Sequence, residues 1–111
     1  MEINVSKVEK FNARNCADKA DEHINEELTL KGLFSFNDER VNEETGDVEN
    51  ITVNCLITED CVIATPSIPF NKSIETLVDT FSEDEIIGLN VMIVERKSKS
   101  GNKFYQLAVI G

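Results

Sequence analysis

The stretch ELTLKGLFSFN, from Glu27 to Asn37, decides how the fold of this chain is interpreted. Apolar and polar side chains alternate along it, as in a strand with one face in a core. Gly32 lies in its middle, and a glycine inside a strand marks a bulge or a sharp bend. A strand bent in this way can serve two halves of one sheet, as a small closed barrel requires. Beyond the bend, alternation alone cannot place Phe34 and Phe36 on a face.

The residues after this strand predict further strands and one helix. A polar loop over residues 38–50 follows the long strand, and residues 51–58 then alternate cleanly as a second strand. After a turn at 59–60, residues 61–65 return as a short third strand. Two prolines then stop strand pairing, because neither can donate a ladder hydrogen bond. Apolar residues at helical spacing follow, and they predict a helix that begins at residues 71–73. Residues 89–110 read as two strands folded on a tight turn.

Residues 1–26 are interpreted as an N-terminal arm or an extra strand. Within them, residues 12–25 show no sustained apolar period and are expected to form a loop with at most one helical turn. Residues 27–111 then form the body of a single folded domain. Their order of strand, strand, strand, helix, strand, strand predicts a mainly β fold, the five-stranded OB-fold Greek-key barrel with one helix between strands 3 and 4. A small α+β sheet with one helix on a face would give the same order.

Composition limits the class of protein. The 111 residues are 41% hydrophobic and 29% charged, which is typical of a globular chain. No apolar run approaches the roughly 20 residues of a membrane helix, and the first residues do not form a signal peptide. Three cysteines without a secretory signal predict reduced thiols in a cytosol. The spacing of these cysteines and the only histidine, His23, matches no zinc motif, so we expect no metal and no cofactor.

The sequence holds no arrangement of side chains that predicts catalysis. His23 lies in a polar segment without a partner visible in the sequence, and the carboxylates belong to turns and solvated faces. No glycine-rich phosphate loop precedes a helix. We therefore predict that the protein is not an enzyme.

Positive charge gathers at the bend of the last hairpin. Residues 88–111 hold four basic residues (Lys or Arg) and one acidic residue. The rest of the chain holds seven basic and twenty acidic residues. A net charge of −10 argues against wrapping duplex DNA or binding anionic membranes. Lysine is common in exposed turns, so solubility alone could explain the positive charge of this hairpin. The negative net charge does not exclude binding to single strands, because a single-strand binder needs only local positive potential and aromatic rings for stacking. In an OB barrel, the loop between strands 4 and 5 is one wall of the ligand surface.

These considerations give a set of candidate contacts to a nucleic acid. Tyr105 shares a face with Leu107 and Val109 and is expected to face the core, while Phe104 points the other way beside the basic bend. The full candidate set is Lys31, Phe34, Phe36, Arg40, Asn54, Arg96, Lys97, Lys99, Lys103, Phe104 and Tyr105.

Two runs of sequence resemble a known family. They are GDVENITVNCLITEDCVIATPSIPFNKSIETLVDTF, from Gly46, and LNVMIVERKSKSGNKFYQLAV, from Leu89. Both are similar to the single-stranded-DNA-binding proteins of the protein-primed Bacillus phages. The resemblance extends from about Leu28 to Val109, with FNA at 11–13 as a weaker echo. It implies a small monomeric protein in the cytoplasm of the infected bacterium. Such a protein coats displaced single strands, without sequence preference, during phage DNA replication, with phage replication proteins as further partners.

The resemblance also implies which rings stack on bases. Such proteins use tyrosines in the first strand, in its loop and in the third strand, and Phe36 falls on the first of these positions. Thr45 and Ile63 fall on the other two and cannot stack, which leaves Phe104 as a substitute. Charge alone supports a second interpretation, an acidic phage inhibitor or DNA mimic that acts on a host nuclease or defence protein. A barrel that only binds other proteins is a third.

Overall fold

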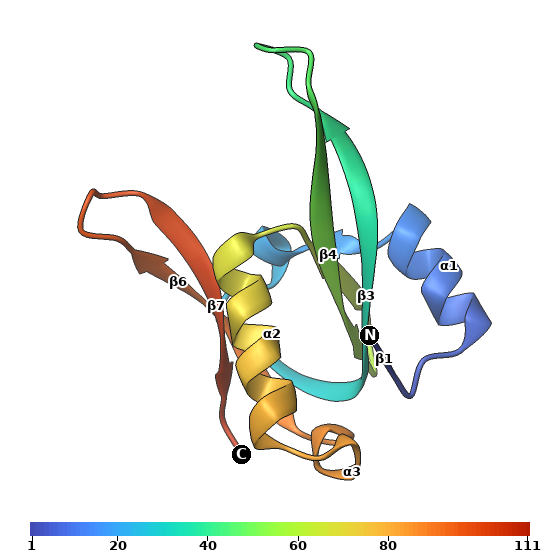
Figure 1. Ribbon diagram of the computed structural model, residues 1–111. Helices are drawn as coiled ribbons and strands as arrows, with labels where there is room; N and C mark the ends of the chain where they lie inside the picture. Colours follow the sequence, from blue (N-terminus) through green and yellow to red (C-terminus); the bar gives the residue numbers. More distant parts are fainter.

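One long strand joins the two halves of the sheet in the computed structural model, which describes residues 1–111 (Figure 1). The strands are β1 (Glu2–Ile3), β2 (Asp18–Lys19), β3 (Glu27–Val41), β4 (Val48–Thr58), β5 (Val62–Thr65), β6 (Asn90–Lys97) and β7 (Lys103–Val109). The helices are α1 (Lys7–Asn15), the 3-10 helix η1 (Ala20–His23), α2 (Ile68–Thr80) and α3 (Glu83–Ile86).

Strand β3 bends where the sequence predicts it. Its first residues pair with β6, and from Leu30 onward it pairs with β4, with a shift of register between Leu30 and Gly32. The sheet runs in the order β2-β5-β4-β3-β6-β7, and β1 pairs with β3. The result is a mainly β fold whose sheet curls into a half-barrel. The predicted bend at Gly32 is therefore confirmed.

Gly32 has a second role that the sequence did not indicate. A β carbon built on it would lie 2.4 Å from the carbonyl oxygen of Ile3 and 2.7 Å from that of Asn4. Both oxygens belong to the backbone of the β1 segment, which pairs with β3 through Ile3 and Leu33. The absence of a side chain at Gly32 is what allows β1 to approach β3 this closely.

The two faces of the sheet pack against different elements. The main core holds Leu33, Leu56 and Ile63 on one face, and α2 covers it with Phe70 and Ile74 (Figure 1). On the opposite face, a smaller cluster forms beneath α1; it comprises Ala13, Phe34, Val53 and Cys55. Both Leu30 and Leu33 are in the main core, whereas neighbouring Phe34 is in the smaller cluster. The irregularity at Gly32 shifts the alternation by one residue, because a bulge moves the following side chains to the other face.

The N-terminal arm is more structured than predicted. The loop expected over residues 12–25 is wrong for its first part, where α1 runs from Lys7 to Asn15. The Ser6 hydroxyl caps the helix by accepting from the Glu9 backbone N–H, and the Glu9 carboxylate accepts from the Ser6 N–H. Strand β2 pairs with β5 in parallel, so the arm adds strands at both β3 and β5 and gives seven in place of five. The sequence signal for α1 is the capping box of Ser6 and Glu9, which an analysis of apolar periodicity does not detect.

Two element boundaries also differ from prediction. Helix α2 begins at Ile68 and not at residues 71–73, because Pro69 lies in its first turn, where a missing N–H leaves no hydrogen bond unmade. The polar loop expected over 38–50 is shorter, since β3 and β4 continue as a ladder to the pair Val41 and Val48. No helix of the structure has both the length and the apolar character needed to cross a membrane.

Candidate nucleic-acid interface

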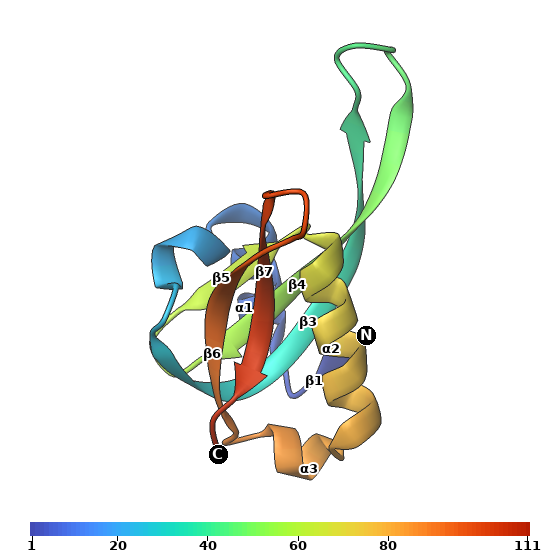
Figure 2. The ribbon, with the colours of Figure 1, turned by 90° about the vertical axis from the view of Figure 1, so that its left-hand side faces the viewer.

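The basic residues lie at the end of the β6–β7 hairpin, which projects to the left of the body in Figure 1 and lies in front of it in Figure 2. Its turn is closed by hydrogen bonds from the Ser98 N–H to the Asn102 carbonyl (2.8 Å) and from the Gly101 N–H to the Ser98 carbonyl (2.9 Å). Gly101 adopts a φ of 88°, which glycine accommodates without strain. We call Arg96, Lys97, Lys99 and Lys103 the basic tip.

The basic tip retains most of its charge for a ligand. The Nζ of Lys103 lies 3.4 Å from Oε1 of Glu95, and this is its single ion pair. The side chains of Arg96, Lys97 and Lys99 are exposed and make no ion pair. Three uncompensated cations thus lie together on a chain whose net charge is −10. Such a local positive potential attracts anions even when the protein as a whole is acidic.

The register of the hairpin separates its two faces. Tyr105 lies opposite Glu95 on the inward face and packs against the main core, which confirms the predicted orientation. Phe104 lies opposite Arg96 on the outward face and is half-buried. Directly opposite residues in an antiparallel pair have neighbouring side chains on one face. The outward face of the hairpin therefore presents a ring beside a free guanidinium.

A pair of aromatic rings lies on the outer face of β3, beneath α1. The rings of Phe34 and Phe36 stack with centroids 5.7 Å apart, and the guanidinium carbon of Arg14 lies 4.6 Å from the Phe36 centroid. Phe34 is only 7% exposed, whereas Phe36 is partly accessible. Arg14 was missed by the sequence analysis, because its place over the rings depends on α1.

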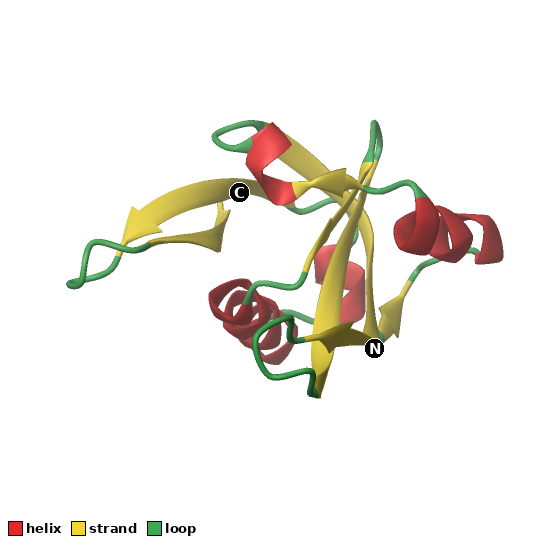
Figure 3. Cartoon of the chain, turned by 90° about the horizontal axis from the view of Figure 1, so that it is seen from above, coloured by secondary structure: helices red, strands yellow, loops and turns green.

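The structure does not bring these two surfaces together. Seen from above, α1 and the β6–β7 hairpin lie at opposite ends of the molecule, with the β3–β4 ribbon between them (Figure 3). Phe36, whose ring contacts Arg14 of α1, therefore lies away from the basic tip. Of the two candidate rings on the hairpin that carries the tip, Phe104 and Tyr105, only Phe104 lies on the outward face.

The remaining candidates have varied surroundings. Lys31 is exposed, and Arg40 pairs with Glu49 across 3.3 Å. Asn54 is 2% exposed, and its amide donates to Oδ1 of Asn71 at 2.7 Å. An amide satisfied in this way contributes to the packing of α2 on the sheet.

The two positions where the resemblance expected a ring also differ from each other. Thr45 is exposed at the end of the β3–β4 hairpin. Ile63 is 0% exposed within the main core. The expectation that residue 63 lies at a stacking position is therefore wrong for this chain, because its side chain points to the inner face of β5.

Comparison with known proteins gives one match. The family model of the Phi29-type phage single-stranded-DNA-binding protein matches residues 2–110. The chain belongs to this family. No curated protein and no solved structure matches it. The match begins at residue 2, so it includes the arm as well as the half-barrel.

Membership of the phage single-stranded-DNA-binding family establishes the activity. The protein binds single-stranded DNA in phage replication, as the resemblance of its sequence implied. The family is one of non-enzymatic DNA-binding proteins. The interpretation as an acidic inhibitor or DNA mimic is not favoured.

Proposed function

We propose that this phage single-stranded-DNA-binding protein holds the displaced strand along the outward face of its β6–β7 hairpin. Phosphates contact Arg96, Lys97 and Lys99, and a base stacks on Phe104. The observation that carries the proposal is the register of Arg96 opposite Phe104, on a hairpin whose segment 88–111 holds four basic residues and one acidic residue. Single-strand binders combine these two features, cations along the backbone and aromatic faces for bases.

The fold supports this assignment. The order of β3, β4, β5, α2, β6 and β7 is that of an OB-like fold, in which the last hairpin is a wall of the ligand surface. We include in the proposal that the protein acts as a monomer in the cytoplasm of the infected bacterium. Replication proteins of the phage are its further partners there.

Phe36 with Arg14 is the second contact that we consider. Arg14 stacks on the partly exposed ring, and a guanidinium on an aromatic face is a surface on which a base can also stack. Its position beyond the β3–β4 ribbon means that a bound strand would have to pass around the ribbon to reach both surfaces. The mutants described next distinguish one contact surface from two.

The first experiment reverses three charges at the tip. The variant with Arg96, Lys97 and Lys99 changed to Glu is compared with one in which Lys7, Lys19 and Lys72 are changed to Glu. All six side chains are exposed, so both variants reach the same net charge with little effect on folding. Binding to oligo-dT is measured as a function of salt concentration.

We expect the tip variant to lose binding and the control to retain most of it. The slope of log K against log salt should be about −0.7 for each phosphate neutralised, so loss of three contacts flattens it by about 2. Equal losses in the two variants would mean that only net charge matters. A tip variant that binds like the wild type would refute the proposed surface.

The second experiment removes each ring. Phe104→Ala and Phe36→Ala should each weaken oligo-dT binding by about 1–3 kcal/mol if a base stacks on the ring. Removal of a ring that serves only the core would instead cost about 3–5 kcal/mol of folding stability. Binding and the urea midpoint are therefore measured on the same proteins. Normal binding by Phe104→Ala would contradict the hairpin surface, and weakened binding by Phe36→Ala alone would move the strand to the face of α1.

A further inference from the structure

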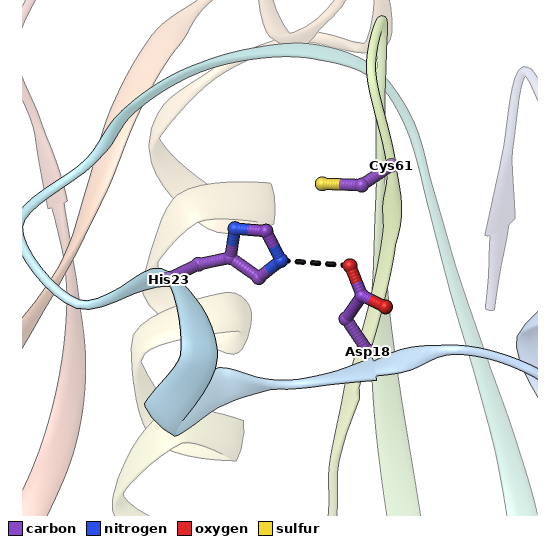
Figure 4. Close-up of side chains that lie close together, drawn as sticks. All are labelled: Asp18, His23 and Cys61. Carbon is purple, nitrogen blue, oxygen red and sulfur yellow. Dashed lines mark hydrogen bonds and ion pairs between the residues drawn. The ribbon is translucent and has the colours of Figure 1, made fainter.

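Three side chains that sequence spacing does not connect meet beside the edge of the sheet. Asp18 comes from β2, His23 from the end of η1, and Cys61 from the residue before β5 (Figure 4). Their ligand atoms, a carboxylate oxygen, a ring nitrogen and a thiol sulfur, all lie within 4.8 Å of one another. The parallel pairing of β2 with β5, with Asp18 beside Ile63, is what brings these segments together.

The imidazole is oriented by a carboxylate on its far side. Oε2 of Glu26 contacts Nδ1 of His23, while Nε2 faces Oδ2 of Asp18 at 2.8 Å. With the Nδ1 proton donated to Glu26, the lone pair of Nε2 points toward Asp18 and Cys61. Metal-binding histidines are held in this manner, with the second ring nitrogen donating to a carboxylate or a carbonyl. The sulfur of Cys61 lies 3.3 Å from the Thr58 hydroxyl, which can orient it.

We propose that Asp18, His23 and Cys61 form a binding site for a divalent transition metal, with Zn²⁺ as the ion that fits best. Zinc accepts all three ligand types, at about 2.3 Å to sulfur and about 2.0–2.2 Å to nitrogen and oxygen. Magnesium and calcium bind oxygen ligands and have no use for a thiol.

The geometry needs only a small adjustment. Tetrahedral bonds of these lengths place the ligand atoms roughly 3.4–3.7 Å apart. Nε2 of His23 and Oδ2 of Asp18 lie 2.8 Å apart, and all three ligand atoms lie within 4.8 Å of one another, so shifts of about 1 Å bring them to these separations. Binding forms a sulfur–metal bond, and the thiol proton of Cys61 leaves to the buffer together with any proton on Nε2 of His23. No oxidation or reduction is involved. The side chains of His23 and Asp18 are 18% and 44% exposed, so a water molecule can occupy the fourth position.

The site has a structural consequence for the arm. Strand β2 is only two residues long, so its pairing with β5 offers few backbone hydrogen bonds. A metal would join β2 and η1 directly to the start of β5. The unfolded chain does not hold the three ligands together, so the metal binds only the folded state. Such binding raises the free energy of unfolding.

The test uses the whole protein after treatment with a chelator. Co²⁺ is titrated first as a spectroscopic probe, and Zn²⁺ is then added in competition. In the absence of metal, the hydrogen bond that Nε2 of His23 donates to the Asp18 carboxylate raises the pKa of His23 above its ordinary 6.5. A proton therefore competes for Nε2, and the titration is run above neutral pH.

We expect one Co²⁺ per chain with a thiolate-to-cobalt charge-transfer band, its displacement by Zn²⁺, and a melting temperature that rises with Zn²⁺. Cys61→Ser and Asp18→Asn should weaken binding at least tenfold. Cys16→Ser is the matched control, since Cys16 is an exposed thiol outside the cluster and its loss should change nothing. Circular dichroism checks that each variant is folded, and Asp18→Asn retains a group that can hydrogen-bond to His23.

Three results would each overturn the proposal. They are the absence of a charge-transfer band in the wild type, full binding by folded Cys61→Ser, and loss of binding in Cys16→Ser. The first would leave His23 as an ion-pair partner of its two carboxylates and nothing more. DNA is absent from all of these measurements, so their outcome is independent of the DNA-binding surface.

Discussion

Replacement of Gly32 by alanine tests how closely the first strand approaches the long bent one. The new β carbon would lie 2.4 Å from the Ile3 carbonyl oxygen and 2.7 Å from that of Asn4. Both atoms belong to the backbone and cannot rotate away, so β1 has to move off β3. The penalty is therefore limited to the free energy that the attachment of β1 contributes.

That contribution can be worked out from the contacts of β1. Ile3 is 3% exposed, and burial of an isoleucine side chain contributes about 2–3 kcal/mol. The hydrogen bonds from the Ser35 N–H to the Met1 carbonyl and from the Asn4 amide to the Lys31 carbonyl add about 1 kcal/mol each. Residues released from the sheet regain conformational entropy, which offsets part of the sum. We expect Gly32→Ala to lower the free energy of unfolding by about 2–4 kcal/mol.

Urea denaturation of four proteins measures this effect. They are the wild type, Gly32→Ala, a chain without residues 1–4, and the truncated chain with Gly32→Ala. Truncation removes both carbonyl oxygens, so alanine should cost less than about 0.5 kcal/mol there if the reasoning holds. The same penalty in the full and the truncated chain would refute it, because the clash would then lie elsewhere.

The other predictions concern the thiols and the missing rings. Burial raises the pKa of the Cys55 thiol to about 11, so a thiol reagent near neutral pH should modify exposed Cys16 and leave Cys55 untouched until urea unfolds the protein. Above the ordinary thiol pKa of 9.0, the unfolded chain loses the Cys55 proton while the folded state keeps it up to about pH 11. The free energy of unfolding should therefore fall as the pH rises from about 9 to 11, and it should fall less in Cys55→Ala. Thr45→Tyr should leave the urea midpoint unchanged and tighten oligo-dT binding if the bound strand reaches the β3–β4 hairpin. Ile63→Tyr should instead lose about 1–3 kcal/mol of stability from overpacking, and a stable Ile63→Tyr protein would contradict its place in the core.

Parts of the candidate site were readable without coordinates. The basic tip and the outward orientation of Phe104 follow from the turn residues and from strict alternation in a short, regular hairpin. The stacking of Arg14 on Phe36 does not, because it depends on a helix whose apolar residues lack a clear period. Its capping box at Ser6 and Glu9 was the local signal available.

The sequence by itself determined the order of the five strands from residue 27 onward, the bend at Gly32 and the place of the positive charge, because each depends on neighbouring residues. Only the tertiary structure decided that Phe34 leaves the main core, since a shift of one residue in a strand exchanges its faces. It also decided that α1 covers the outer face of the sheet and that Asp18 and His23 meet Cys61. These contacts join segments about forty residues apart in the chain, and the pairing of β2 with β5 that creates them leaves no periodic mark on the sequence.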